Sequence, residues 1–201
     1  VPGARSVTAV DPGSHAPLAE LQQRDGTGLF EAPLGASRRP YRLRITWGDG
    51  RSGVYADAYA FGAALGEQDV HFLGEGSHLR PYEALGAHLM QADDGAGPID
   101  GTRFAVWAPN ASRVSVVGEF NGWDGRRHPM RVRHGVGVWE IFIPHVGVGD
   151  RYKFEIRAAD GQVLPLKADP FAFAAELRPA TASVVAAPVR RALPVDRHAA
   201  N

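Results

Sequence analysis

The chain contains the stretch Val114-Ser-Val-Val-Gly-Glu-Phe-Asn-Gly-Trp-Asp124, in which an apolar run leads into a tight turn and a large aromatic side chain. The β-branched residues predict a buried strand that ends at Gly118, because glycine is placed where a strand bends or another backbone comes close. Asn121-Gly122 is a turn signal directly before Trp123. We therefore expect Trp123 at the rim of a sheet, where its indole either packs over the sheet end or faces a ligand.

A sugar is the ligand that suits an indole held by a rigid turn. One face of a pyranose ring consists of C–H groups that lie flat against an aromatic ring, while polar side chains bond the hydroxyls at the ring edge. The candidate sugar contacts are Trp123, Asn121, Asp124 and Lys153. Simple packing of the indole at the end of the sheet is the alternative, and this stretch alone does not decide between the two.

The flanking sequence alternates between apolar and polar residues, as half-buried strands do. Tyr152, Phe154 and Ile156 face one side of a predicted strand, and Lys153 faces the other. Many short strands separated by Gly, Pro, Asn and Asp turns are typical of β-sandwiches. The predicted strands are 6–10, 18–21, 28–34, 41–47, 102–107, 113–118, 137–143 and 151–158, with a closing strand within 176–185.

The two halves of the chain repeat one pattern. Tyr41-Arg-Leu-Arg-Ile, an Asp-Gly turn and Asp57 reappear in the same order as Tyr152-Lys-Phe-Glu-Ile, a second Asp-Gly turn and Asp169. We therefore predict an all-β chain of two tandem immunoglobulin-like β-sandwiches, the first truncated, joined by a short helical connector. The predicted parts are the first sandwich 1–56, a connector with a short helix and a loop 57–88, the second sandwich 89–185 and a linker 186–201.

The composition argues against several classes of partner. Lys+Arg and Asp+Glu both number 22, so the chain of 201 residues has no net charge to attract nucleic acid or an anionic membrane. No apolar run approaches the roughly 20 residues that a membrane helix needs. Cysteine is absent, which excludes disulfides and thiolate metal sites and fits a reducing cytoplasm.

No catalytic constellation can be assembled from the sequence, and we expect no catalytic residue, metal site or cofactor. Hydrolase elbow, phosphate-loop and zinc-protease motifs are all missing. The histidines lie in separate loops without ligand spacing. Asp57 and Asp169 each follow a strand and are predicted to be turn or capping residues. Trp139 lies within an apolar strand and is predicted to be in the core, whereas Trp107 suits either core or surface.

Long stretches of the chain resemble the N-terminal region of bacterial glycogen branching enzymes of the α-amylase superfamily. The resemblance covers about Asp57 to Val185 and has few gaps. Residues before Asp57 look like the additional N-terminal sandwich that many bacterial members carry. The stretches that carry the resemblance are His78-Leu-Arg-Pro-Tyr-Glu-Ala-Leu-Gly-Ala-His88, Phe104-Ala-Val-Trp-Ala-Pro-Asn-Ala111, Val114 through Met130-Arg131, Gly137-Val-Trp-Glu-Ile-Phe-Ile-Pro144, Tyr152-Lys153-Phe154 and Lys167 through Ser183.

The resemblance implies a function and two partners. In such enzymes these domains precede a (β/α)8 barrel whose Asp nucleophile and Glu acid/base cleave α-1,4 links and form α-1,6 branches. That barrel would follow Asn201, and this chain would bind or position α-glucan beside it. In the related glucan-binding modules, including that of the β subunit of AMP-activated kinase, the residues matching Trp123 and Lys153 contact glucose. Those modules add a second Trp where this chain has Val163.

Two alternatives to glucan binding by a branching enzyme remain at this point. In the first alternative, the domains are purely structural and serve only as a docking surface for the barrel. Or the chain is the same region of a debranching or trehalose-releasing relative, which uses a similar module.

Overall fold

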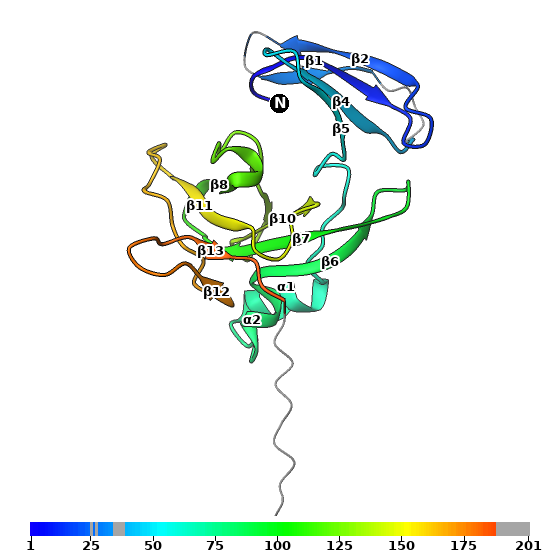
Figure 1. Cartoon of the computed structure of the whole chain (residues 1–201). Coiled ribbons are helices and arrows are strands. Elements are labelled where there is room, and N and C mark those ends of the chain that lie inside the picture. The colour runs from blue at the N-terminus through cyan, green and yellow to red at the C-terminus, as the bar shows by residue number, and fades with distance from the viewer. Residues whose placement is uncertain (25, 27, 34–38, 188–201) are drawn as a thin grey trace, which may run out of the picture.

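The computed structural model describes residues 1–24, 26, 28–33 and 39–187, and among these it is built mainly of antiparallel strands. Figure 1 shows one sheet, at the top of the view, connected to a larger body in which two further sheets lie together. Helical structure in this part of the chain is limited to two short α-helices and one 3-10 turn. The all-β prediction is therefore confirmed.

The first part of the chain forms one five-stranded sheet in the order β3-β2-β1-β4-β5. A small cluster of Ala4, Val7 and Ile45 lies under it, with Trp47 packed against its edge. The region predicted as the first sandwich is therefore a single sheet with a small core among the described residues. The strands are β1 Ala4–Val10, β2 Pro17–Arg24, β3 Leu29–Glu31, β4 Arg42–Trp47 and β5 Ser52–Tyr55. The end of the strand predicted at 28–34 lies outside the described residues.

The connector contains the predicted helix and one that was not predicted. Helix α1 spans Glu67–Glu75 and ends at Gly76, whose φ of 70° closes the last turn. The loop predicted within the connector 57–88 also holds α2 Pro81–Ala84, which begins at a proline, as first turns often do. Strand β6, Gly86–Asp93, begins just before the boundary predicted at residue 89.

Two four-stranded sheets form the second part of the chain. Their orders are β6-β7-β10-β9 and β12-β13-β11-β8, and all pairings are antiparallel. Strand β8 leads directly into the short 3-10 turn η1 Glu119–Asn121. The strands are β7 Pro98–Trp107, β8 Ala111–Gly118, β9 Arg131–Arg133, β10 Val138–Pro144, β11 Arg151–Ala158, β12 Ala174–Ala175 and β13 Ser183–Val184.

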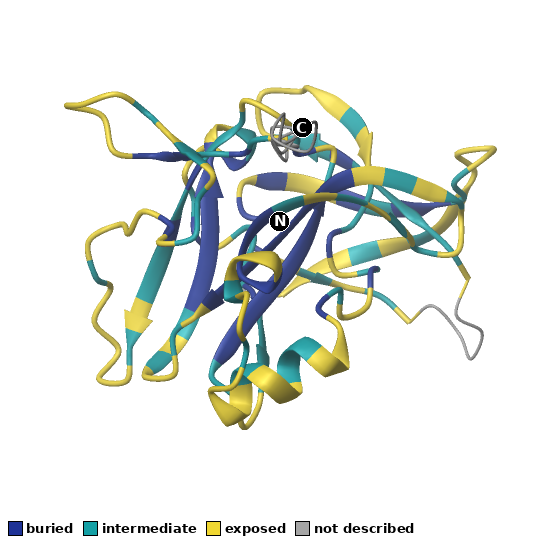
Figure 2. Cartoon of the chain, turned by 90° about the horizontal axis from the view of Figure 1, so that it is seen from below, coloured by how far each residue is buried: buried dark blue, intermediate teal, exposed yellow. Residues whose placement is uncertain are grey.

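The inner faces of these two sheets enclose one apolar core. Phe104 from β7 and Tyr152 from β11 are both fully buried, and their rings meet edge to face with centroids 4.9 Å apart. Figure 2 shows the buried residues along the central strands of this sandwich. The same cluster contains Val114 and Val116, so the apolar run of β8 lies in the core as predicted. The core thereby fixes the sheet edge from which the Trp123 turn projects.

The predicted repeat reappears as an identical set of hydrogen bonds. In the first copy the Tyr41 hydroxyl donates to Asp57 at 2.7 Å, and in the second the Tyr152 hydroxyl donates to Asp169 at the same distance. Each aspartate also accepts the backbone N–H of the residue two positions later, at 2.9 Å and 2.8 Å. Asp57 and Asp169 are thus turn residues, as expected. Burial raises the pKa of Asp169.

Candidate functional site

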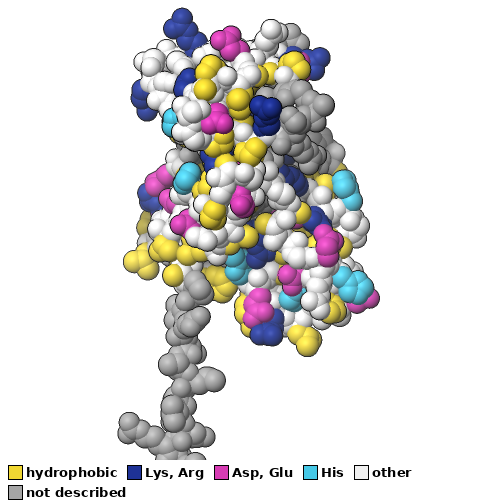
Figure 3. Space-filling view, turned by 90° about the vertical axis from the view of Figure 1, so that its right-hand side faces the viewer, with side chains coloured by type: hydrophobic (Ala, Val, Ile, Leu, Met, Phe, Trp, Pro, Cys, Tyr) yellow, Lys and Arg dark blue, Asp and Glu magenta, His cyan; other side chains and the backbone are white. Residues whose placement is uncertain are grey.

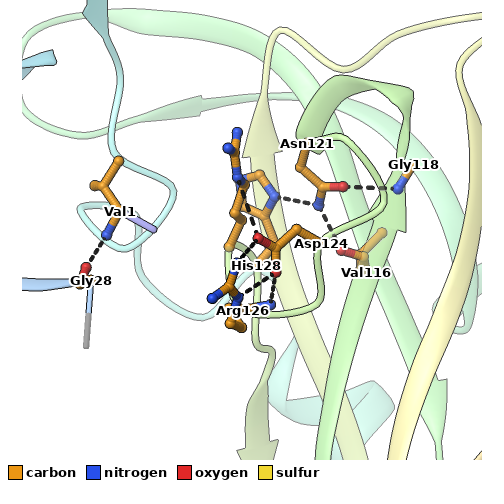
Figure 4. A network of polar contacts seen from close by, with 9 residues as sticks. Val1, Gly28, Val116, Gly118, Asn121, Asp124, Arg126 and His128 are labelled. Atoms are coloured by element: carbon orange, nitrogen blue, oxygen red, sulfur yellow. Dashed lines mark hydrogen bonds and ion pairs between the residues drawn. The ribbon is translucent and has the colours of Figure 1, made fainter. Parts of the chain in front are cut away.

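Residues 119–128, which we call the Trp123 loop, follow strand β8 and are organised by Asn121. This side chain is 2% exposed. Its Oδ1 accepts the Gly118 N–H at 3.0 Å, and its Nδ2 donates to the Val116 carbonyl at 2.9 Å. Nδ2 also lies 2.9 Å from Nδ1 of His128, at the far end of the loop. Figure 4 shows these contacts converging on one amide, so Asn121 points into the loop and closes it.

Trp123 is held in an unusual backbone conformation at the tip of this loop. Its φ is 59°, and that of Gly122 is 66°, so two consecutive residues are left-handed. Such a conformation is unfavourable for a bulky side chain and persists only where the surroundings enforce it. Here the Trp123 N–H donates to the Gly118 carbonyl at 2.9 Å. The indole remains 37% exposed, which leaves part of the ring open to a ligand.

Asp124 is already paired with protein cations. Its two carboxylate oxygens accept Nε and NH2 of Arg126 at 2.9 Å and 2.8 Å, and Oδ1 also accepts the Arg126 N–H at 3.0 Å. The side-chain hydrogen bonds from Arg126 lower the pKa of Asp124 to about 2. The carboxylate therefore stays ionised near neutral pH, and its main contacts hold the loop.

Lys153 lies on the outer face of β11, on the same side as the Trp123 loop. Its Cα pairs with that of Val117 on β8, and its Nζ donates to the Thr181 hydroxyl at 2.6 Å. Glu155 projects from the same face, two residues along the strand. Gly125 of the loop sits so close to the Glu155 carboxylate that any side chain there would collide with it. The fold thus brings the Trp123 loop, through Gly125, against the face of the β8–β11 pair that carries Lys153 and Glu155.

His128 closes the loop as a neutral side chain. Burial, with a smaller contribution from the nearby charge of Arg127, lowers its pKa to about 4. Because Asn121 Nδ2 is a donor, Nδ1 of the neutral His128 ring accepts its hydrogen bond. Sequence reasoning gave His128 no role, because its importance depends on burial that a single loop sequence does not reveal.

Residues 84–172, which include the loop and Lys153, match the model of carbohydrate-binding module 48, described as the isoamylase N-terminal domain. This part of the chain is similar to that module, and we refer to residues 84–172 as the module 48 domain on that basis. A 1,4-alpha-glucan branching enzyme of Rhizobium etli is 51% identical over 94% of this chain and 25% of its own length. One of Pseudomonas fluorescens is 52% identical over the same shares. The resemblance to branching enzymes is thereby confirmed.

The chain spans about a quarter of the length of the curated relatives it matches. Among solved structures, the pullulanase of Bacillus acidopullulyticus aligns with a TM-score of 0.40 and 16% identity, over 73% of this chain and 15% of that chain. The branching enzyme of Rhizobium johnstonii, at 54% identity over 93% of this chain, again aligns over only 25% of its own length.

The position of the second tryptophan of related modules is also visible in this module 48 domain. Val163 follows the Asp160-Gly161 turn and is 46% exposed. It forms an isolated bridge with Arg157 at the end of β11. An isopropyl group there offers much less apolar area than an indole and no aromatic ring on which a sugar could stack.

The two tryptophans of the flanking strands of the module 48 domain have different environments. Trp139 is 8% exposed and donates its Nε1–H to the Ala108 carbonyl at 3.0 Å, which confirms the core prediction. Trp107 is 59% exposed and donates to the Val136 carbonyl at 3.1 Å. It lines an open groove of about 680 Å³ between the end of α1 and the β9–β10 hairpin. The question left open for Trp107 is thus resolved in favour of the surface.

The described residues offer no other evident chemical centre near the module 48 domain. No group of three or more His, Asp or Glu residues in this part of the chain could hold a metal ion. No helix among them is long and apolar enough to cross a bilayer. Figure 3 shows basic and acidic side chains interspersed over one face, without a large region of one sign.

Proposed function

We propose that this chain binds α-glucan through the Trp123 loop and Lys153, as part of a 1,4-α-glucan branching enzyme that acts in glycogen synthesis. The observation that carries the proposal is a partly exposed indole, held in a left-handed conformation, in a loop that lies against the face of β11 that carries a lysine. The indole is suited to stack on the apolar face of a glucose unit. The kinship of the chain with branching enzymes supports α-glucan as the sugar.

The four predicted site residues have different proposed roles. Trp123 stacks on the sugar. Lys153 donates to sugar hydroxyls, because an ammonium has three N–H donors and the bond to the Thr181 hydroxyl uses one of them. Asn121 is nearly fully buried, and Asp124 is paired with Arg126. We therefore assign to Asn121 and Asp124 the role of shaping the loop, and to Trp123 and Lys153 the direct contacts.

The proposal extends to the rest of the protein. Catalysis belongs to a C-terminal barrel that cleaves α-1,4 links and forms α-1,6 branches, in the cytoplasm, with this chain packed beside it. Tethering a weak glucan site to that barrel raises the local concentration of glucan chains at the catalytic cleft. The division into 1–56, 57–88, 89–185 and a linker 186–201 is part of this proposal. It is supported by separate apolar clusters in the two sheet regions, while residues 188–201 lie outside the described structure.

The test is isothermal titration of the 201-residue chain with maltoheptaose. We expect Trp123→Ala to weaken binding about five- to 150-fold, because stacking of a flat ring on an aromatic side chain contributes roughly 1–3 kcal/mol. Trp107→Ala is the matched control, since it removes an even more exposed indole from a different surface. Equal affinities for the wild type and Trp123→Ala would refute the assigned site. The absence of any binding by the wild type would favour the alternative in which these domains only dock on the barrel.

A further inference from the structure

The Trp123 loop contacts the first sheet through one side-chain pair. The guanidinium carbon of Arg127, a loop residue, lies 5.0 Å from the centroid of the Trp47 ring. Trp47 is the last residue of β4, far from the loop in sequence. A guanidinium over an indole at this distance is an attractive contact. The first sheet therefore touches the loop that carries the proposed glucan contact.

Trp47 is held in place by its own sheet. Its backbone N–H donates to the Arg51 carbonyl at 2.8 Å, and its carbonyl accepts the Gly50 N–H at 3.0 Å. Its Cα pairs with that of Ala4 on β1, and its side chain packs against the apolar cluster of this sheet. The first sheet thus holds the backbone and side chain of Trp47 in place beside Arg127.

Arg127, in contrast, has few other contacts that orient its side chain. Its Nε is buried and has no hydrogen-bond partner among the described residues. It lies 3.9 Å from the Asp124 carboxylate, a distance of charge attraction without a hydrogen bond. The Arg127 N–H donates to the Asp124 carbonyl at 3.1 Å, which ties its backbone to the residue after Trp123. This hydrogen bond links Arg127 to Asp124, which follows Trp123 in the loop.

Other contacts hold the connector and the first sheet against the module 48 domain without using this pair. Arg131 donates three hydrogen bonds to carbonyls of residues 59, 61 and 62, at 3.1, 2.6 and 2.9 Å. The Tyr59 hydroxyl donates to the Pro129 carbonyl at 3.0 Å, and Arg42 forms an ion pair with Asp94. Loss of the Arg127–Trp47 contact should therefore loosen the loop without separating the two parts.

We propose that Trp47 is a positioning residue for glucan binding, which acts by holding Arg127 and, through it, the Trp123 loop in the binding conformation. This inference rests on the proposed function of the loop. The loop carries two consecutive left-handed residues, a conformation that its surroundings must maintain. When only a fraction of the molecules has the competent loop, the apparent affinity falls by that fraction.

The first test compares maltoheptaose affinity in the wild type, Trp47→Ala, Arg127→Ala and the double variant. Each single change is expected to weaken binding about two- to fivefold, the range of one exposed cation–π contact. The affinity of the double variant should be no lower than that of the single variant with the lower affinity, because both changes remove the same contact. Arg127→Lys should restore part of the affinity, since an ammonium also binds an indole face. Unchanged affinity in Trp47→Ala, or additive losses in the double variant, would overturn the proposal.

The second measurement needs no sugar. Hydrogen exchange of the amides of residues 119–128 is expected to be faster in Trp47→Ala than in the wild type, because a loosened loop opens more often. Tyr55→Ala is the control, since it removes an exposed aromatic from the adjacent strand β5 of the same sheet. If the wild type binds no glucan, the proposed function fails while exchange still reports whether Trp47 holds the loop. Unchanged exchange in Trp47→Ala would overturn the positioning role.

Discussion

Replacing Asn121 with alanine will destabilise the sandwich domain and disorder the Trp123 loop. The change removes an acceptor at 3.0 Å from the Gly118 N–H and a donor at 2.9 Å from the Val116 carbonyl, both in the buried end of β8. A buried backbone group left without a partner costs roughly 1–3 kcal/mol. Asn121→Ala leaves two such backbone groups without partners, but the space left by the smaller side chain lets the surroundings relax somewhat. We therefore expect a loss of about 2–4 kcal/mol in the free energy of unfolding.

The assay is urea unfolding followed by circular dichroism, with maltoheptaose titration of the folded variant alongside. Asn110→Ala is the matched control, because Asn110 is an exposed turn residue between β7 and β8 and its replacement should change stability by less than about 0.5 kcal/mol. Affinity for glucan should fall in Asn121→Ala in native buffer as well, since the loop loses its closing contact. A free energy of unfolding within about 0.5 kcal/mol of the wild type would refute the view that Asn121 organises the loop.

Two further predictions concern pH and the core. The pKa of His128 falls from an ordinary value near 6.5 to about 4 on folding, so the unfolded chain binds the proton more tightly. The stabilisation that comes from keeping His128 neutral, on the order of 3 kcal/mol, is complete above about pH 6.5 and is lost as the pH falls towards 4. The urea midpoint, measured over a pH series, should therefore fall between pH 6.5 and 4. His128→Gln should make the midpoint less dependent on pH in this range. Phe104→Ala removes a fully buried ring packed on Tyr152 and should lower the free energy of unfolding by about 3–5 kcal/mol. The control is Leu177→Ala, at a side chain 90% exposed, which should leave the thermal midpoint unchanged. Similar midpoints for the two variants would contradict the assignment of the core.

Local patterns in the sequence were sufficient for the class of fold and for the kinship. Alternation along 151–158 predicted which side chains of β11 enter the core, because a strand sends successive residues to opposite faces. The repeated Tyr and Asp positions predicted turn residues, and both copies form the same hydrogen bond. A short helix in the connector was also predicted, but the second helix, α2, was not, since one turn of helix has almost no periodic pattern.

The environment of each site residue could be read only from the folded chain, because it depends on neighbours that are remote in sequence. Asn121 and Asp124 are equally polar in the sequence, yet one is buried against β8 and the other is paired with Arg126. Trp107 and Trp139 lie in similar apolar strands, and only packing against the rest of the chain makes one exposed and the other buried. Contact between Arg127 and Trp47 arises where the Trp123 loop meets the first sheet, and no local pattern in the sequence encodes that contact. Periodicity along a chain specifies which face of a strand is apolar, whereas the partner that covers a given side chain is specified by the packing of the whole molecule.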